Sequence, residues 1–162
     1  MEENFKSKVL TNPLYFIAAG FGSGLLPFAP GTWGTLIAIP IYWFLSAYSL
    51  IIYLAVTSAA FALGVFVTDW VSRDMGEHDY GGIVWDEIVG YLITMILVPV
   101  SVTWIIVGFL LFRLFDIWKP QPIRYIDQTI TGGLGIMLDD GLAAIYAWIV
   151  LQGLIWGLAG KF

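Results

Sequence analysis

Ten of the twelve acidic residues of this chain fall into two blocks separated by long uncharged stretches. Residues 9–68 carry no formal charge, and a second uncharged stretch covers residues 88–112. The first block contains Asp69, Asp74, Glu77, Asp79, Asp86 and Glu87. The second contains Asp116, Asp127, Asp139 and Asp140, with the cations Arg113, Lys119 and Arg124 among them. Carboxylates gathered at the ends of apolar segments, beside a few cations, are typical of a site for a polyvalent cation and an anion.

The candidate metal ligands are the carboxylates that lie where apolar helices are expected to begin or end. They are Asp86, Glu87, Asp116, Asp139 and Asp140. Mg²⁺ prefers oxygen ligands, usually one or two carboxylates together with waters and phosphate oxygens of the substrate. The alternative role is helix capping, because aspartate is favoured at helix N-termini and complements the helix dipole. Two adjacent acids such as Asp86 and Glu87 repel each other unless a cation is present, which favours the metal site.

Cations and hydroxyls near these carboxylates are candidates for binding a phosphate. Arg113, Lys119 and Arg124 surround Asp116 in the sequence and carry the charge that phosphate recognition needs. Alternatively they mark the cytoplasmic interface, and Arg113 anchors the helix or pairs with a carboxylate.

A second set of possible phosphate donors precedes an expected helix. Thr32 and Thr35 lie there in the stretch PGTWGT, where hydroxyls and backbone N–H groups can bind an anion. The alternative is that these threonines are ordinary helix caps.

Several kinds of chemistry are excluded by residue types that the chain lacks. There is no cysteine, so thiolate metal sites, disulfides and cysteine nucleophiles are ruled out. The single histidine, His78, is expected on the surface of a solvated loop, and a phosphohistidine mechanism needs a second histidine. The D-x-D-x-T pattern of haloacid-dehalogenase phosphatases is also absent. A water activated by a metal ion is the simplest nucleophile that remains.

The elements that position these residues are those of a membrane protein. The chain is 59% hydrophobic and 12% charged, whereas soluble domains are about 25% charged. We expect an all-α, polytopic membrane helical bundle that forms one domain over residues 1–162. Its length allows roughly four or five spans of about 20 residues. Residues 1–13 form a polar arm or a short interfacial helix, and residues 14–26 form a re-entrant or interfacial helix. The net charge of −5 argues against nucleic acid as a partner.

Between these spans the sequence predicts a hairpin and three loops. The hairpin joins residues 35–45 and 50–68 around Ser46–Ser49. Loops are expected at residues 28–34, 72–82 and 119–138, the last because of its prolines and its GGxG turn. The final span follows Asp139 and Asp140 and covers residues 141–158.

Residues 83–118 allow two arrangements that differ in their consequence for the site. A single helix over residues 88–112 would place the two acidic blocks on opposite sides of the bilayer, about 30 Å apart. A hairpin that turns at Pro99–Ser101 would bring them together. Pro99 disfavours an uninterrupted helix and favours the hairpin. The hairpin also places nearly all lysines and arginines on one side, which the positive-inside rule makes cytoplasmic.

Four stretches of this sequence carry a resemblance to a known family. They are GFGSGLLPFAPGTWGT (20–35), DYGGIVWDEIVG (79–90), FRLFDIWKPQPIR (112–124) and GGLGIMLDDGLAAIYA (132–147). As a set they resemble the phosphatidylglycerophosphatase A family of bacterial membrane enzymes. The resemblance implies a magnesium-dependent hydrolase in the cytoplasmic (inner) membrane, with its active site on the cytoplasmic face. It would convert phosphatidylglycerol phosphate to phosphatidylglycerol and phosphate in phospholipid biosynthesis.

Residues and resemblance together give a mechanistic hypothesis. The five carboxylates named above hold one or two Mg²⁺, unless one of them acts as general base on the attacking water. Lys119 and Arg124 clamp the phosphate, Arg113 supports the same anion site, and Thr32 and Thr35 add donors. The partners are then the phospholipid substrate and the membrane, and the sequence does not identify whether there is a protein partner.

Other functions remain open at this point. A cation transporter or channel would carry carboxylates near the membrane midplane and an internal repeat, and the sequence has no such repeat. A structural or partner-binding membrane protein would tolerate neutralisation of the carboxylates. A phosphatase for another lipid phosphate, such as phosphatidic acid or an isoprenoid phosphate, is the alternative within the enzyme class.

Overall fold

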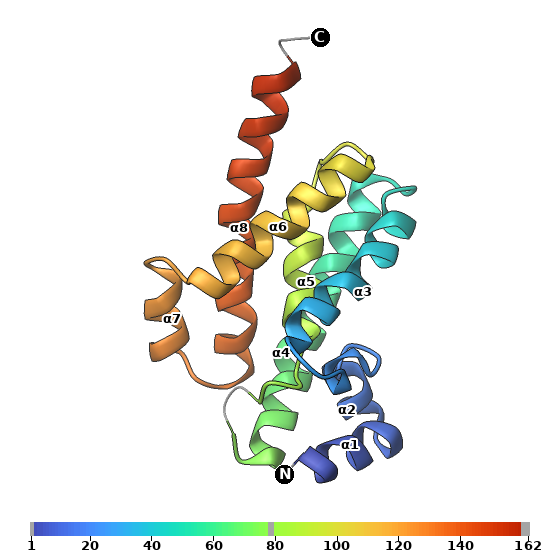
Figure 1. Ribbon diagram of the computed structural model, residues 1–162. Coiled ribbons are helices and arrows are strands. Elements are labelled where there is room, and N and C mark those ends of the chain that lie inside the picture. Colours follow the sequence, from blue (N-terminus) through green and yellow to red (C-terminus); the bar gives the residue numbers. More distant parts are fainter. Residues whose placement is uncertain (1, 78–79, 160–162) are drawn as a thin grey trace.

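The structure is a computed structural model that describes residues 2–77 and 80–159. Helices are the only regular elements among these residues (Figure 1). The α-helices are α1 (Glu2–Thr11), α2 (Pro13–Ala18), α3 (Pro30–Leu45), α4 (Leu50–Met75), α5 (Trp85–Thr94), α6 (Val102–Trp118), α7 (Ile123–Thr129) and α8 (Gly132–Ala159), and a 3₁₀ turn η1 covers Ser23–Leu25. The all-α prediction is confirmed. His78 and Asp79 lie outside the described residues, so the expected place of His78 on the surface stays a prediction.

The N-terminal arm is helical, which is one of the two alternatives that the sequence left open. Phe5 and Val9 are spaced by four residues on α1, and both are buried against Tyr15 and its neighbours. Asn12 caps α2 by accepting a hydrogen bond from the N–H of Leu14 at 2.9 Å. The helix expected over residues 14–26 is shorter than predicted: α2 ends at Ala18, and Gly20 follows in a left-handed conformation with φ 52°.

Two loops predicted from glycine and polar residues are partly helical. Helix α3 begins at Pro30, a residue preorganised for the first helical position, so Gly31–Gly34 are not loop residues. Helix α4 continues to Met75 and ends at Gly76, which caps it in the left-handed region with φ 70°. The hairpin of α3 and α4 around Ser46–Ser49 is confirmed.

The hairpin at Pro99 is also confirmed. Helix α5 ends at Thr94, and α6 begins at Val102 after Ser101, whose side chain accepts a hydrogen bond from the N–H of Trp104 at 3.3 Å. In Figure 1 this turn and the α3–α4 turn lie at one end of the molecule, whereas α1, the end of α4 and the start of α8 lie at the other. The two acidic blocks therefore share one half of the molecule.

The GGxG segment is the beginning of α8 and not a turn, which corrects the predicted loop over residues 119–138. A side chain at Gly133 would collide with the carbonyl of Val65, so this glycine serves the contact between α8 and α4. Residues 123–129 of the same predicted loop form α7. Asp139 and Asp140 consequently lie within α8 and do not open it, so neither is an N-terminal cap of that helix.

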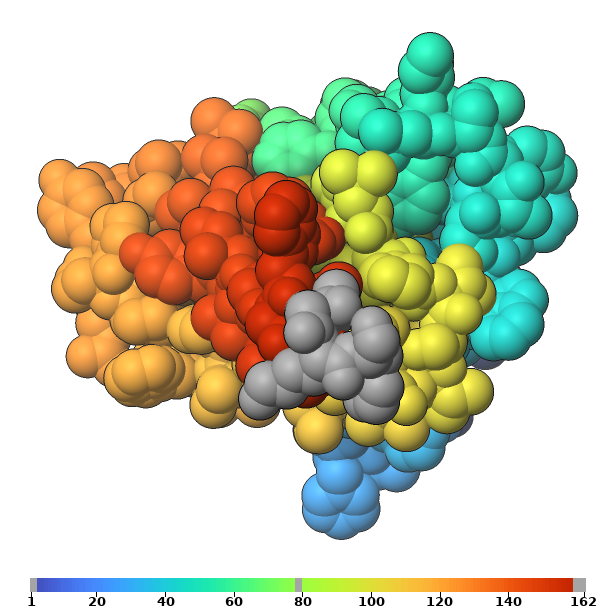
Figure 2. Space-filling model, turned by 90° about the horizontal axis from the view of Figure 1, so that it is seen from above, coloured from blue at the N-terminus to red at the C-terminus, as the bar shows by residue number. Residues whose placement is uncertain are grey.

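Helix α5 lies at the centre of the bundle. Nearly all of its residues are buried, and α3, α4, α6 and α8 pack around it. Its ten residues measure about 15 Å, half of the roughly 30 Å hydrocarbon thickness. Viewed from the end where α8 finishes, the red α8 lies between the orange α7 region and the yellow α5–α6 turn (Figure 2).

Two helices of the described chain are long and apolar enough to cross a membrane, Leu50–Met75 and Gly132–Leu158. The predicted four or five spans are therefore not confirmed. Helices α3 and α6 have 16 and 17 residues, which is short of the roughly 20 residues that a span requires.

Candidate functional site

Three carboxylates from two helices form the centre of the site. Asp86 and Glu87 lie in the first turn of α5, and Asp140 lies on α8. One oxygen from each of the three lies within 4.8 Å of the others. Gly90 allows this approach, because a side chain there would collide with the ring of Phe112 and reach 3.4 Å from the carbonyl of Asp140.

This cluster is buried, which makes its charge costly unless it is compensated. Asp86 is 7% exposed and Asp140 is 3% exposed. Glu87 Oε2 and Asp140 Oδ2 are buried without a hydrogen-bond partner among the described residues. Buried carboxylate oxygens without partners are destabilising, whereas a metal ion would satisfy them. The donor set contains only oxygen, so it suits a hard divalent cation.

Asp116 joins the cluster through Arg113. The Arg113 Nη1 atom lies 2.6 Å from Asp116 Oδ2, one helical turn along α6, and 3.7 Å from Glu87 Oε1. The Asp116 carboxylate also interacts electrostatically with Asp140 and Glu87. Arg113 is thus a partner of carboxylates, which is one of the three roles that the sequence left open for it.

The start of α3 covers the Arg113–Glu87 pair. A Cβ atom at Gly31 would collide with Glu87 Oε1 and lie 2.9 Å from Arg113 Nη1. Thr35 is buried, and its hydroxyl donates to the carbonyl of Gly31 at 2.8 Å, within the same helix. Thr32 is half-buried, and its N–H donates to the carbonyl of Ala29 at 2.9 Å. The PGTWGT segment therefore meets the site through Gly31, which the sequence reasoning did not select.

Lys119 forms a second group with two carboxylates. It follows α6 in a left-handed conformation with φ 44°, and its Nζ lies 2.7 Å from Asp127 Oδ1 and 2.6 Å from Asp139 Oδ2. Burial disfavours the ammonium ion, but the hydrogen bonds that it donates to Asp127 and Asp139 outweigh burial and raise the pKa of Lys119. Asp139 Oδ1 accepts the N–H of Asp140 at 2.9 Å, which connects this group to the central cluster.

The remaining predicted phosphate ligand, Arg124, belongs to neither group. It is exposed on α7 and makes no ion pair with the described residues. Asp127 was absent from the predicted site because nothing in the sequence shows which way α7 faces. The two groups together contain six carboxylates and two cations, so their formal net charge is −4.

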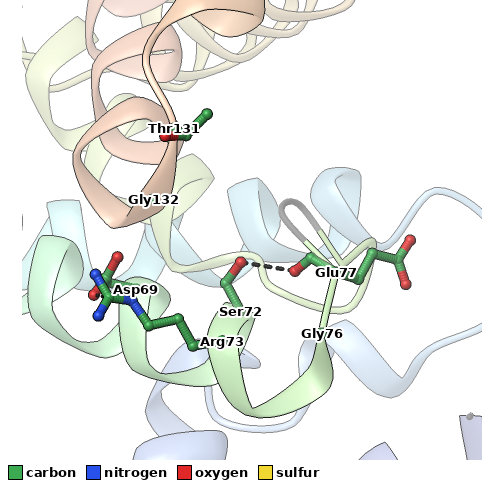
Figure 3. A pocket seen from close by; sticks show the side chains of 7 residues that line it. All are labelled: Asp69, Ser72, Arg73, Gly76, Glu77, Thr131 and Gly132. Carbon is green, nitrogen blue, oxygen red and sulfur yellow. Dashed lines mark hydrogen bonds and ion pairs between the residues drawn. The ribbon is translucent and has the colours of Figure 1, made fainter.

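The cavity in Figure 3 lies outside these two groups. It has a volume of about 330 Å³ and is lined by Asp69, Ser72, Arg73, Gly76, Glu77, Thr131 and Gly132. Asp69 pairs with Arg73 at 3.0 Å and accepts the N–H of Gly133 at 3.1 Å, so it ties the start of α8 to α4. Ser72 donates to the carbonyl of Glu77 at 2.7 Å, as Figure 3 shows. This part of the first acidic block joins helices, whereas Asp86 and Glu87 form the site.

Fold and site together define an all-helical protein with apolar helices suited to a membrane and a buried acidic centre. A family described as Phosphatidylglycerophosphatase A matches residues 16–155. The chain therefore belongs to the phosphatidylglycerophosphatase A family of phosphatases, and the resemblance drawn from its four motifs is confirmed.

Individual relatives agree over nearly the whole chain. The chain is 48% identical over 155 residues to the phosphatidylglycerophosphatase A of Haemophilus influenzae, with 93% of this chain and 95% of that protein covered. It is 42% identical over 137 residues to the Escherichia coli protein of the same name, which covers 84% and 80% of the two chains. A Bacteroides thetaiotaomicron relative, provisionally named phosphatidylinositol-3-phosphatase, is 39% identical over 149 residues, with 86% and 92% covered. No solved structure gave a significant match.

Proposed function

We propose that this enzyme hydrolyses phosphatidylglycerol phosphate to phosphatidylglycerol and phosphate, with Mg²⁺ bound at the carboxylate cluster, as the last step of phosphatidylglycerol biosynthesis. The observation that carries the proposal is the meeting of Asp86, Glu87 and Asp140 within 4.8 Å in a buried position. The substrate follows from family membership, and the metal follows from the chemistry of the donors.

The charge of the site supports the need for a cation. A phosphate monoester brings negative charge to a centre whose own formal charge is −4. Without compensation the two would repel each other strongly, because charges interact more strongly at a buried site than in water. When bound, Mg²⁺ supplies the positive charge that holds phosphoryl oxygens and activates a water molecule.

In this proposal the carboxylates bind the metal and accept the proton of the attacking water. Asp86, Glu87 and Asp140 are the principal metal ligands, while Asp116 and Asp139 complete the acidic set beside Arg113 and Lys119. One carboxylate accepts a proton from the attacking water as its oxygen bonds to phosphorus. The bond between phosphorus and the glycerol oxygen breaks, and that oxygen takes a proton to become the hydroxyl of phosphatidylglycerol.

The cations serve the phosphoryl group in this proposal. The Lys119 ammonium has three N–H donors, and two of them are used by Asp127 and Asp139. The third is available to a phosphoryl oxygen and stabilises its charge in the transition state. Arg124 and Arg113, with the Thr32 and Thr35 region of α3, are proposed to line the approach of the headgroup.

The same proposal places the protein in the inner membrane as a multi-pass enzyme. α4 and α8 cross the bilayer. The shorter α3 enters it as the other arm of a hairpin with α4, and α5 and α6 enter it as a second hairpin. The turns of both hairpins lie at the same end of the molecule (Figure 1). The lysines and arginines of α1, α4, α6 and α7 lie at the other end, which the positive-inside rule assigns to the cytoplasm. The acyl chains remain in the bilayer while the headgroup enters from the cytoplasmic leaflet.

Two observations bear on the alternative functions. The carboxylates of α5 lie in the first turn of that helix, whereas a cation transporter would hold them near the middle of its spans. The Bacteroides thetaiotaomicron relative carries the name of an inositol lipid phosphatase, which makes another lipid phosphate the second candidate substrate.

Phosphate release from purified enzyme in mixed micelles tests the proposal. Phosphatidylglycerol phosphate, phosphatidic acid and phosphatidylinositol 3-phosphate are compared, each with Mg²⁺ and with excess EDTA. We expect phosphatidylglycerol phosphate to have the highest kcat/KM, EDTA to abolish turnover and added Mg²⁺ to restore it. Full activity in EDTA would refute the metal site. A higher kcat/KM for another lipid would mean that this lipid, and not phosphatidylglycerol phosphate, is the substrate.

A further inference from the structure

We propose that Asp127 is a positioning residue for the phosphatase reaction, which holds the Lys119 ammonium in place between α7 and α8. The inference rests on the proposed function, because it assigns Lys119 to the phosphoryl group. Asp127 does not touch the central cluster in the described contacts. It acts through Lys119 alone.

The geometry gives Lys119 two carboxylate partners with different surroundings. Asp127 Oδ1 lies 2.7 Å and Asp139 Oδ2 lies 2.6 Å from the ammonium nitrogen. The Asp139 side chain is 7% exposed, whereas that of Asp127 is 35% exposed. Asp139 is thus the fixed inner partner, and Asp127 is the outer partner that determines where the ammonium lies along the rim of the site.

The orientation of Asp127 follows from the way α7 packs. Ile123 opens this short helix and is fully buried in the main core. Residue 127 is four positions later, so its side chain shares the face of Ile123 and points inward. The hydroxyl of Tyr146 on α8 donates to the carbonyl of Gln121 at 3.3 Å and holds the connection from α6 to α7. Asp127 is therefore carried by an anchored element.

Removal of the Asp127 charge would leave the long Lys119 side chain less restrained. A lysine has four rotatable bonds and loses much rotamer entropy when it is held in one place. With Asp139 as its only partner, the ammonium would turn towards α8 and away from the position where the headgroup phosphate arrives. This change weakens substrate binding and leaves the metal ligands of α5 and α8 in place, so the effect should appear in KM and not in the Mg²⁺ requirement.

A double-mutant cycle with a matched control tests the inference. Asp127→Asn, Lys119→Met and the double variant are assayed on phosphatidylglycerol phosphate, with Mg²⁺ varied separately. We expect Asp127→Asn to raise KM about tenfold and to change kcat less than about threefold, as loss of a ground-state contact does. The Mg²⁺ concentration for half-activation should stay within about twofold, and Asp127→Glu should recover part of the loss.

The coupling between the two residues distinguishes positioning from general stabilisation. In the Lys119→Met background, Asp127→Asn should change kcat/KM by less than about twofold, because the group it positions is gone. Asp74→Asn is the control: Asp74 forms a pair of similar length, 2.6 Å, with Lys8 on α1, and its loss should leave the kinetics unchanged. Unchanged KM in Asp127→Asn, or additive effects in the cycle, would overturn the positioning role. Wild-type enzyme without Mg²⁺-dependent phosphate release would overturn the proposed function, a result seen before any variant is made.

Discussion

Gly31 of α3 lies against Glu87 of α5 so closely that a single added methyl group would collide with the glutamate carboxylate. The contact joins the start of α3 to the acidic centre, and Arg113 Nη1 lies beside it, 2.9 Å from the place that a Cβ would occupy. Glycine is required here for space and not for its backbone freedom. The contact explains why position 31 of this motif is glycine: the start of α3 lies directly against the site there.

Gly31→Ala should impair catalysis by displacing Glu87. The carboxylate and the Arg113 side chain must both shift, and a metal ligand that moves by even about 1 Å loses much of its effect. We expect kcat to fall at least about tenfold and the Mg²⁺ concentration for half-activation to rise. Steady-state kinetics at several Mg²⁺ concentrations measure both quantities.

Gly153→Ala provides the matched control for this substitution. Gly153 also lies within a helix, but a Cβ there would meet nothing within 4 Å. Alanine is favoured over glycine in helix interiors, so this variant should keep full activity. If the two variants had equal kcat values and equal Mg²⁺ requirements, the close contact of Gly31 with Glu87 would not matter for catalysis.

Neutralising the clustered carboxylates should cost far more than neutralising acids outside the site. Asp86→Asn, Asp140→Asn and Glu87→Gln each neutralise a proposed metal ligand while preserving the shape of the side chain. We expect kcat to drop at least about 10²-fold in each, which corresponds to about 2.7 kcal/mol of transition-state stabilisation. Phosphate release at saturating substrate is the measurement.

The same comparison extends to Asp116 and Asp139, the two carboxylates beside the central three. Asp116→Asn and Asp139→Asn should also lower kcat, because each leaves a cation, Arg113 or Lys119, without its nearest partner. Glu3→Gln on the exposed side of α1 should be neutral. Near-normal rates in all five site variants would mean that the chemistry takes place elsewhere.

Most of the residues that meet in the candidate site could be predicted because their cues are local. Pro99 disfavours a continuous helix through residues 88–112, and the resulting hairpin is what brings Asp116 towards Asp86 and Glu87. Prediction failed where tertiary contacts decided the outcome. The glycines at 132, 133 and 135 suggested a turn, yet they belong to α8, and side chains at 133 and 135 would collide with the carbonyl groups of Val65 and Ile130. This misreading placed Asp139 at a helix start instead of within α8.

Asp127 and Gly31 were missed for a related reason. Whether Asp127 faces Lys119 depends on the rotation of α7, which the burial of Ile123 determines. Whether Gly31 meets Glu87 depends on how α3 packs beside α5. Neither relation leaves a periodic signal in the chain, so the sequence could identify the acidic residues but not the residues that position them.

Both acidic blocks should be accessible from the same side of the membrane. Because the chain has no cysteine, single cysteines can be introduced at exposed positions: Glu77 before α5, Gln128 on α7 and Tyr48 in the α3–α4 turn. We expect Glu77→Cys and Gln128→Cys to react with an impermeant maleimide only from the cytoplasm, and Tyr48→Cys only from outside. Labelling of positions 77 and 128 from opposite sides would refute the placement of one shared site at the cytoplasmic face.

Lys119→Ala should differ from loss of a metal ligand, because an ammonium ion cannot coordinate Mg²⁺. It removes a phosphate contact and also leaves Asp127 and Asp139 without their shared cation. A contact present in the ground state raises KM when it is lost, and one that strengthens in the transition state lowers kcat. We expect both changes, since charge redistributes onto the phosphoryl oxygens as the bond to glycerol breaks.

Lys119→Arg separates the charge of this residue from its shape. A guanidinium keeps the positive charge between the two carboxylates, but its planar fork does not reproduce the compact ammonium ion, so activity should be recovered only in part. Kinetics on phosphatidylglycerol phosphate, with the Mg²⁺ concentration varied independently, should show half-activation near the wild-type value in both variants. A large rise in the Mg²⁺ requirement of Lys119→Ala would mean that Lys119 supports the metal site through Asp139. Unchanged kinetics in Lys119→Ala would mean that Lys119 is only an interfacial anchor and that Arg124 or Arg113 contacts the phosphate.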